Sequence, residues 1–316
     1  MVSSRLAEMF GAGAAETFLG LPRARVETLP ECVAATVLGA DTATPYASVG
    51  AYCAGGAAAI RAGAADFAAN RGHVNFDLGA PLAAEGALVD AGDIATDPGD
   101  AAGNRARIAA AVASVAGAGA VPVLLGGDDS LPIPVLEAFA DRGPLWVVQV
   151  DAHIDWRDAV DGERLGLSSP MRRASEMGHV AGLVQVGARG IGSARAADLD
   201  DARDWGARLH PMRAVARDGL GPALADVPAG ADVILCFDFD VLDPAAMPAV
   251  IARTPGGMGY WQALELIAGV AGKARIRAAV FAEFMAERDI DGLGARSAAG
   301  LVMATLGLVA RAGARV

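Results

Sequence analysis

The sequence predicts an α/β fold, in which helices cover both faces of a mostly parallel β-sheet. Short apolar runs bounded by Gly, Pro or Asp alternate with alanine-rich helical segments, which is the pattern of a parallel sheet. Hydrophobic residues make up 53% of the 316 residues and charged residues 20%, so the chain can form a large core. No repeat or linker divides the chain. We expect a single three-layer αβα domain over residues 31–316, preceded by an N-terminal extension, residues 1–30, that packs on the domain or on a neighbouring subunit.

Seven apolar runs predict the strands of this sheet. They are short, rich in Val, Ile and Leu, and bounded by turn residues, which is typical of strands buried on both faces. In chain order they are Val33–Leu38, Gly86–Asp90, Val121–Leu125, Leu145–Val150, Gly182–Val186, Val233–Phe237 and Ala278–Phe281.

Helices are predicted between these strands, mostly where alanine-rich segments follow turn residues. The predicted helices are Ala57–Phe67, Ala101–Ala118 after a Pro-Gly-Asp turn, Pro132–Ala140 after a Gly-Gly turn, and Tyr260–Ala271 after Pro-Gly-Gly. The stretch Ile108–Gly127 carries no charge over about the length of a membrane span. Gly117, Gly119 and Pro122 interrupt it, so we assign it to a helix followed by a buried strand.

The charge of the chain restricts its partners. A net charge of −11 and an isoelectric point near 4.8 argue against nucleic acid or an anionic membrane, because both require a basic surface. A small or cationic ligand is compatible with this charge. The N-terminus lacks the pattern of a secretion signal, and the cytoplasm is the expected location. Cys32, Cys53 and Cys236 show no CxxC spacing, and we expect reduced cysteines in the core.

Acidic residues follow three of the predicted strands. Gly126-Gly127-Asp128-Asp129-Ser130 follows one strand, Asp151–Asp155 follows the next, and Asp238 and Asp240 follow a third. Ligands of parallel sheets bind beyond the carboxyl ends of the strands. The three strands are therefore expected to bring these carboxylates to one edge of the sheet.

The spacing of these residues suits a metal site. In Asp-Ala-His-Ile-Asp, strand-like alternation would direct Asp151, His153 and Asp155 to one side. Capping of a following helix is the alternative interpretation of this segment taken alone. Asp238 and Asp240 repeat the alternation, and two carboxylates so close repel each other unless a cation or proton neutralises them. Two divalent ions about 3.5–4 Å apart would remove this repulsion and activate a water molecule.

These motifs resemble those of the ureohydrolases, the family of the arginases and agmatinases. The resemblance covers most of the chain. It is carried by Thr17–Gly20, Val37–Ala40, Gly55–Arg61, Asp90–Asp93, Gly126–Ser130, Asp151–Asp155, Pro170–Ala174, Phe237–Pro244 and Pro255–Gly257.

The resemblance implies an arginase-like fold, a dinuclear manganese centre, with Ni²⁺ as the other possible ion, and cleavage of a guanidino C–N bond to urea and an amine. Asp151 and Asp238 would bridge the two ions, His153 and Asp240 would complete one site, and Asp155 and Asp129 would complete the other. Glu283 would hold the substrate guanidinium and, with Asp155, is a candidate catalytic residue; an ordinary strand-end carboxylate is the alternative for Glu283. A homo-oligomer, trimer or hexamer, is also implied.

Two positions depart from the family pattern. Asp129 stands where the family has histidine in Gly-Gly-Asp-His-Ser, and an aspartate oxygen lies as many bonds from Cβ as an imidazole Nδ1, so the ligand geometry can be kept. Leu167 stands where agmatinase-like sequences carry a histidine credited with proton transfer to the leaving amine. Leucine cannot transfer a proton, and such a transfer typically contributes about 10²–10⁴-fold. Glu163, His179 or Glu287 remains open as a substitute.

Two functional hypotheses follow. The first is an agmatinase-like hydrolase of linear amidine C–N bonds acting on a small cationic guanidino compound. The second is a weak or inactive paralogue that serves as partner subunit in a heteromeric guanidine or biguanide hydrolase. Retention of the ligand positions favours the first, whereas Leu167 and the bulky stretch Ala249–Arg253 favour the second.

Overall fold

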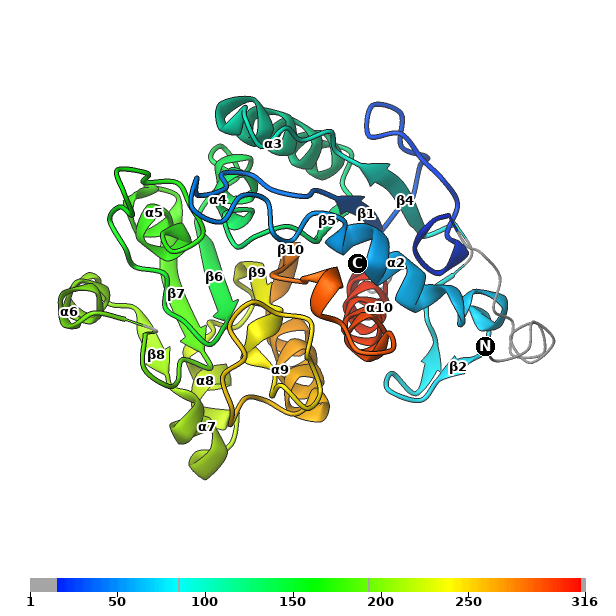
Figure 1. Cartoon of the computed structure of the whole chain (residues 1–316). Coiled ribbons are helices and arrows are strands. Elements are labelled where there is room, and N and C mark those ends of the chain that lie inside the picture. The colour runs from blue at the N-terminus through cyan, green and yellow to red at the C-terminus, as the bar shows by residue number, and fades with distance from the viewer. Residues whose placement is uncertain (1–15, 85, 193, 314–316) are drawn as a thin grey trace.

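Eight strands form one sheet, in which every neighbouring pair of strands is parallel. The computed structural model describes residues 16–84, 86–192 and 194–313. The strand order is β4-β1-β5-β10-β9-β6-β7-β8 (Figure 1). The strands are β1 Ala35–Gly39, β4 Leu88–Asp93, β5 Val121–Leu125, β6 Leu145–Val150, β7 Val180–Val186, β8 Arg208–His210, β9 Asp232–Asp238 and β10 Arg275–Ala282; Val74–Asn75 (β2) and Ala80–Pro81 (β3) form a separate antiparallel hairpin. All seven predicted strands are confirmed: two have the predicted ends, the others differ by up to three residues at an end, and β8 is added at one edge.

Helices cover both faces of the sheet, as Figure 1 shows. One face is covered by α3 Ala101–Gly117, α4 Pro132–Glu137, α5 Pro170–Glu176 and α6 Ala196–Trp205, and the other by α2 Gly56–Ala65, α7 Met212–Asp218, α8 Gly221–Asp226, α9 Tyr260–Lys273 and α10 Leu293–Gly313. Each face has its own hydrophobic core. In β5, for example, Val123 and Leu125 belong to one core and Leu124 to the other, because successive side chains point to opposite faces. The predicted three-layer α/β architecture is therefore confirmed.

The helices α5 to α8 and α10 lie outside the predicted set. Helix α10 is long and apolar enough to cross a membrane, but 67% of its most apolar window is buried within the molecule. It packs against α2 and α9 as a core helix. The charge-free stretch from Ile108 forms the second half of α3 and then β5, as expected. Of the three cysteines, Cys53 and Cys236 are buried as expected, but the prediction for Cys32 was wrong: it is exposed, in a turn with φ of 65° just before β1.

A buried ion pair joins α2 to β4 and to the start of the described chain. The Arg61 guanidinium donates through Nε to Asp90 Oδ2 at 2.8 Å and through Nη2 to Asp90 Oδ1 at 3.0 Å. Asp90 Oδ2 also accepts from the backbone N–H of Phe18 at 2.7 Å. The predicted boundary between an extension and the domain at residue 30 remains a prediction, because residues 1–15 lie outside the described residues. Within the described part, Phe18, Leu19 and Leu21 are buried in the core.

We expect Arg61→Met to lower the free energy of unfolding by about 3–5 kcal/mol, because it leaves the fully buried Asp90 carboxylate without its partner. Urea-induced unfolding followed by circular dichroism measures this change. The matched control is Arg23→Met, which breaks an exposed ion pair with Glu16 and should cost less than about 1 kcal/mol. Equal effects of the two substitutions would show that the buried pair is not a stabilising feature.

Backbone geometry at the end of β5 requires two glycines. Gly126 and Gly127 have φ of 82° and 75°, in the left-handed region. A Cβ on Gly126 would lie 2.5 Å from the backbone N of Ala57, and one on Gly127 would lie 2.7 Å from the carbonyl O of Ala40. The chain therefore turns sharply at the carboxyl end of β5 and delivers Asp128 and Asp129 to the rim of the sheet.

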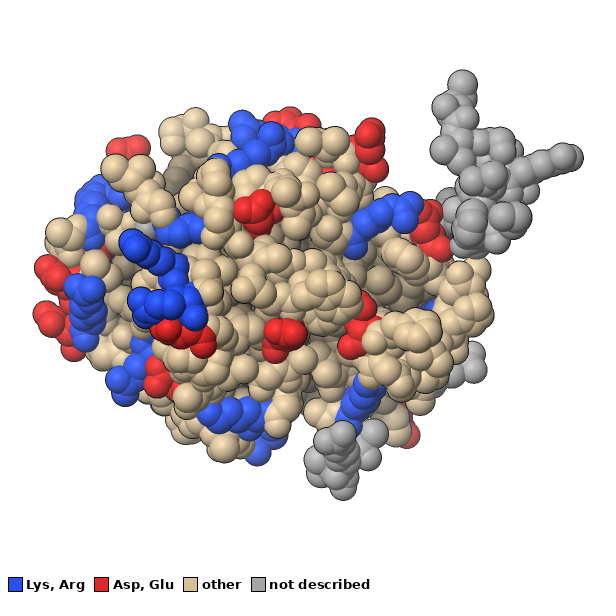
Figure 2. Space-filling model, turned by 90° about the horizontal axis from the view of Figure 1, so that it is seen from below, with Lys and Arg blue, Asp and Glu red and all other residues tan. Residues whose placement is uncertain are grey.

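The surface charges do not form a single basic region on the face that Figure 2 shows. Acidic and basic side chains lie near one another around a largely uncharged area. This distribution agrees with the net charge of −11 and offers no extended basic surface on this face for a polyanion.

Candidate active site

The predicted site residues lie at the carboxyl ends of four neighbouring strands in the middle of the sheet. These strands are β5, β10, β9 and β6, in that spatial order. Asp129 lies just after β5, and Glu283 directly follows β10. Asp238 ends β9 and Asp240 follows it, while Asp151, His153 and Asp155 follow β6. The strand order thus brings together residues that are up to 154 positions apart in the sequence, such as Asp129 and Glu283.

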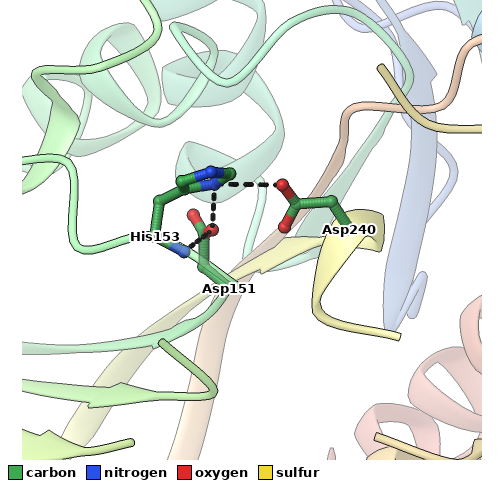
Figure 3. A group of neighbouring side chains, drawn as sticks. All are labelled: Asp151, His153 and Asp240. Carbon is green, nitrogen blue, oxygen red and sulfur yellow. Dashed lines mark hydrogen bonds and ion pairs between the residues drawn. The ribbon is translucent and has the colours of Figure 1, made fainter. Parts of the chain in front are cut away.

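One group of potential ligands consists of Asp151, His153 and Asp240 (Figure 3). The Nδ1 atom of His153 lies 3.3 Å from Asp151 Oδ1 and 3.0 Å from Asp240 Oδ2. The backbone N–H groups of His153 and Ala152 donate to Asp151 Oδ1 at 2.6 Å and to Asp240 Oδ1 at 3.1 Å. These bonds fix the orientation of both carboxylates, so that one oxygen of each faces the imidazole.

The imidazole holds a proton where a cation would bind. Burial opposes the charged form of His153, but its hydrogen bonds to Asp151 and Asp240 raise its pKa to about 12. The proton on Nδ1 therefore neutralises the two carboxylates that face it. A metal ion at the same position would displace this proton, because a histidine ligand binds metal in its neutral form.

A second group consists of Asp129, Asp151 and Asp238, whose nearest ligand atoms all lie within 4.8 Å of one another. All three residues are buried, and Asp151 belongs to both groups. Burial first, and then the neighbouring carboxylates, raises the pKa of both Asp129 and Asp238. Asp129 Oδ2 is buried and has no hydrogen-bond partner among the described residues.

Asp155 reaches the site through a turn, which differs from the predicted alternation. Strand β6 ends at Val150, and Asp155 has φ of 51°, so residues 151–155 form a loop. Its side chain nevertheless lies against Asp151, and Gln149 Nε2 donates to both carboxylates. Burial and then Asp151 raise the pKa of Asp155. Asp155 is therefore next to the two groups, although neither group includes it.

Asp240 is likewise outside its strand, because β9 ends at Asp238 and Phe239–Val241 form a 3-10 turn, η3. The expected separation of polar and apolar side chains is still present. Phe237 and Phe239 are fully buried and pack edge to face, with ring centroids 5.7 Å apart. The backbone N–H of Asp240 donates to Asp238 Oδ1 at 2.6 Å, which keeps both carboxylates at the rim.

Glu283 directly follows β10 and projects into the same site. Its φ of 66° is uncommon for a residue other than glycine, and such conformations concentrate at functional sites. Its Oε1 accepts a hydrogen bond from the hydroxyl of Tyr52 and one of 3.0 Å from the backbone N–H of Asp129. Burial raises the pKa of Glu283 to about 8, despite these two hydrogen bonds. A cation next to Glu283 would favour its charged form.

A cavity of about 210 Å³ connects these groups. This volume is below the ~300–1,000 Å³ of pockets for drug-sized ligands, so it suits a small substrate. Besides the six acidic and histidine side chains Asp129, His153, Asp155, Asp238, Asp240 and Glu283, it is lined by Tyr52, Trp156, Arg157, Leu167, Ser168, Gly192, Asp198, Ile251 and Ala252. Leu167 is therefore placed at the site, as the motif predicted.

None of the candidate substitutes for the missing proton donor lines this cavity. His179 Nε2 is hydrogen-bonded to the carbonyl of Leu136. Glu287 is exposed in the 3-10 helix Ala286–Arg288 (η4). Glu163 accepts from the backbone N–H of Leu165 at 2.7 Å. Ile251 and Ala252, from the bulky stretch Ala249–Arg253, do line the cavity.

Three further lining residues had weak signals or none in the sequence. Arg157 follows Asp155 by two positions, and this proximity was the only indication that it would lie at the site. Tyr52 and Asp198 come from loops or helices far away in the sequence, and no motif marks them. Only the folded chain places the Tyr52 hydroxyl on Glu283.

The site fits a pair of divalent cations. Five buried carboxylates and one imidazole converge there, and burial in an apolar interior without a counter-charge is unfavourable for carboxylates. A bound ion would give the unpartnered Asp129 Oδ2 a partner. Two ions would also explain why Asp151 belongs to both groups of potential ligands. Oxygen-rich ligand sets of this kind suit hard ions such as Mn²⁺.

We expect Asp129→His to retain bound metal, because Nδ1 of the new imidazole lies as many bonds from Cβ as the present carboxylate oxygen. Metal content after loading and desalting, measured by inductively coupled plasma mass spectrometry, checks this. Asp129→Ala is the matched control, and it should bind less metal than the wild type and less than Asp129→His. Loss of metal from the histidine variant to the level of the alanine variant would contradict the assignment of position 129 as a ligand.

Comparisons with known proteins identify the family to which the chain belongs. The family model described as "Arginase family" matches residues 35–307. The guanidinopropionase of Pseudomonas aeruginosa is 34% identical over 233 residues, which cover 72% of each chain. The mitochondrial arginase 1 of Arabidopsis thaliana is 32% identical over 57% of this chain, and the match spans about half, 53%, of that arginase.

A solved structure agrees over nearly the whole chain. The proclavaminate amidino hydrolase from Streptomyces clavuligerus superposes with a TM-score of 0.79 and 27% sequence identity, covering 95% of this chain and 99% of that one. The family model covers the four strands that carry the site, from β5 to β10. On the fold, the motifs and these matches together, the chain belongs to the arginase family.

Proposed function

We propose that the chain is a hydrolase that cleaves the C–N bond of a small guanidino compound and releases urea and an amine. One observation carries this proposal: two groups of potential ligands share the buried Asp151, and all their other members line one cavity together with the buried carboxylate of Glu283. A guanidinium is a planar cation with several N–H donors, and a carboxylate is its natural partner. Related proteins named guanidinopropionase and guanidinobutyrase support this choice of substrate.

In this proposal the metal ligands are Asp129, Asp151, His153, Asp155, Asp238 and Asp240, and the ions are two Mn²⁺, with Ni²⁺ as the alternative. When bound, such a pair lowers the pKa of water and so supplies a nucleophile at neutral pH.

The remaining steps fall to the chain itself. Glu283 holds the guanidinium and orients its carbon, and Tyr52 together with the backbone N–H of Asp129 fixes Glu283 by binding Oε1. The apolar side chains of Leu167, Ile251 and Trp156 restrict the entry of water to the cavity. Leu167 gives no proton to the leaving amine, so we expect slower turnover than a histidine at this position would allow.

The test is metal content followed by urea release. The purified chain is loaded with Mn²⁺ or Ni²⁺, desalted and analysed for metal, and then assayed with agmatine, arginine, 3-guanidinopropionate and 4-guanidinobutyrate. About two ions per chain and release of urea from any of them is the expected result. Bound metal with no turnover on any guanidine would contradict the proposal and favour an inactive partner subunit.

A further inference from the structure

The charges that line the cavity are unevenly distributed. The lining includes the acidic residues described above, whereas Arg157 is the only lysine or arginine among the lining residues. A guanidinium bound to Glu283 lies among these acidic residues. The remaining lining residues are Arg157, Asp198 and mainly apolar or small side chains, so Arg157 offers the one cationic group for the other end of a linear substrate.

The fold holds Arg157 firmly in this position. Its backbone N–H donates to the carbonyl of Ser168 at 3.0 Å, which ties the loop after β6 to the loop that carries Leu167. Its side chain is 24% exposed, and Nε lies 3.2 Å from Asp198 Oδ2. The same Oδ2 accepts from the backbone N–H of Arg195 at 3.0 Å, at the start of α6. Arg157 is therefore anchored through its backbone and its Nε.

The two terminal nitrogens of this guanidinium remain available. The one ion pair of the Arg157 side chain among the described residues uses Nε, and no side-chain hydrogen bond there involves Nη1 or Nη2. A planar guanidinium with two free N–H groups on one edge matches the two oxygens of a carboxylate. An ammonium group in the same place would instead meet a like charge, and Asp198 offsets this only in part because its Oδ2 already has two partners.

We propose that Arg157 binds an anionic group at the uncleaved end of the substrate, so that the chain acts on guanidino carboxylates in preference to guanidino amines. This inference rests on the proposed function, since it assumes that Glu283 binds the guanidinium. It assigns Arg157 as the residue that determines specificity.

Three substrates that each carry four carbons on the guanidino nitrogen separate the effect of the tail charge: 4-guanidinobutyrate with a carboxylate, agmatine with an ammonium, and butylguanidine with no charge. For the Mn²⁺-loaded chain we expect 4-guanidinobutyrate to bind more tightly than agmatine in isothermal titration calorimetry and to have the highest kcat/KM. The expected ratio is about ten- to a hundredfold, the range that a hydrogen bond between charged groups supplies.

Variants distinguish recognition from a structural role. Arg157→Gln should bring the preference for 4-guanidinobutyrate over butylguanidine close to one. The loss should be seen in the ratios of Kd and of KM more than in the ratio of kcat. Arg157→Lys should restore part of the preference. Asp198→Asn breaks the same ion pair but keeps the charge of Arg157, so the preference for the carboxylate should persist or increase. If Arg157 only anchors α6, Arg157→Gln and Asp198→Asn will instead affect all three substrates equally.

The outcomes separate this inference from the proposed function. Hydrolysis of butylguanidine and agmatine with no preference for the carboxylate would overturn the role of Arg157 and leave the hydrolase intact. If no guanidine is hydrolysed, the proposed function fails, and the binding measurement still decides the inference: equal or tighter binding of agmatine overturns it.

Discussion

Asp238→Asn will remove most of the bound metal and lower kcat/KM for urea release by at least about a hundredfold. Even residues that only orient metal ligands typically contribute 10- to 100-fold to affinity or activity, and Asp238 is itself proposed as a ligand. The substitution keeps the shape of the side chain but removes the negative charge from the group that it forms with Asp129 and Asp151. Metal analysis and a urea assay measure the two effects.

The same substitution should stabilise the metal-free protein. Burial and the carboxylates of Asp240 and Asp151 raise the pKa of Asp238, which means that its charged form destabilises the folded state. Asparagine removes this cost, so the metal-free variant should melt at a higher temperature than the metal-free wild type. Its further stabilisation by added Mn²⁺ should be smaller than that of the wild type.

Asp232→Asn is the matched control, because it makes the same change at the opposite end of β9, where Asp232 pairs with the exposed Arg275. It should leave metal content and kcat/KM unchanged. A wild-type metal content in Asp238→Asn would contradict the proposed ligand set, and a lower melting temperature of its metal-free form would contradict the account of the carboxylate repulsion.

Glu283→Gln should lower kcat/KM by about 10²–10⁴-fold while the metal content stays the same. The substitution replaces a buried carboxylate, which bonds to a guanidinium cation, by a neutral amide, and loss of one charge in a buried pair costs about 3–5 kcal/mol. The loss should be found with every guanidino substrate, because Glu283 faces the part of the substrate that all of them share.

Glu287→Gln is the control for this experiment. Glu287 is exposed, lies four residues further along the chain in η4, and does not line the cavity. It should have wild-type kinetics. An equal loss in both variants, or a loss of metal in Glu283→Gln, would show that Glu283 acts on the loop or on the metal site and not on the substrate.

Much of the fold could be predicted because its signals are local. A strand buried on both faces needs a continuous apolar run, and Val121–Leu125 and Leu145–Val150 were predicted with the ends that the structure shows. The helices after clear turn residues were also predicted, whereas α10 was not, although its 21 residues are strongly apolar. Its role depends on packing against α2 and α9, which no local pattern reveals.

The candidate ligands were predictable for a similar reason. Asp151 and His153 follow one apolar strand, Asp238 ends another and Asp240 follows it, and the carboxyl ends of parallel strands lie at one edge of the sheet. The route by which Asp155 and Asp240 reach the site was not predictable. Both lie beyond the ends of their strands, in a left-handed turn and a 3-10 turn, where the two-residue alternation no longer applies.

The sequence by itself determined the layer architecture, the family motifs and the two departures at positions 129 and 167, because these depend on residue type and spacing along the chain. The tertiary structure decided which residues share the cavity. The order of the sheet places β10 and β9 between β5 and β6, and this brings Glu283 next to Asp129 and within reach of Tyr52. The packing of α6 against the loop after β6 then sets Arg157 beside Asp198, a contact that depends on distance in space and leaves no pattern in the sequence.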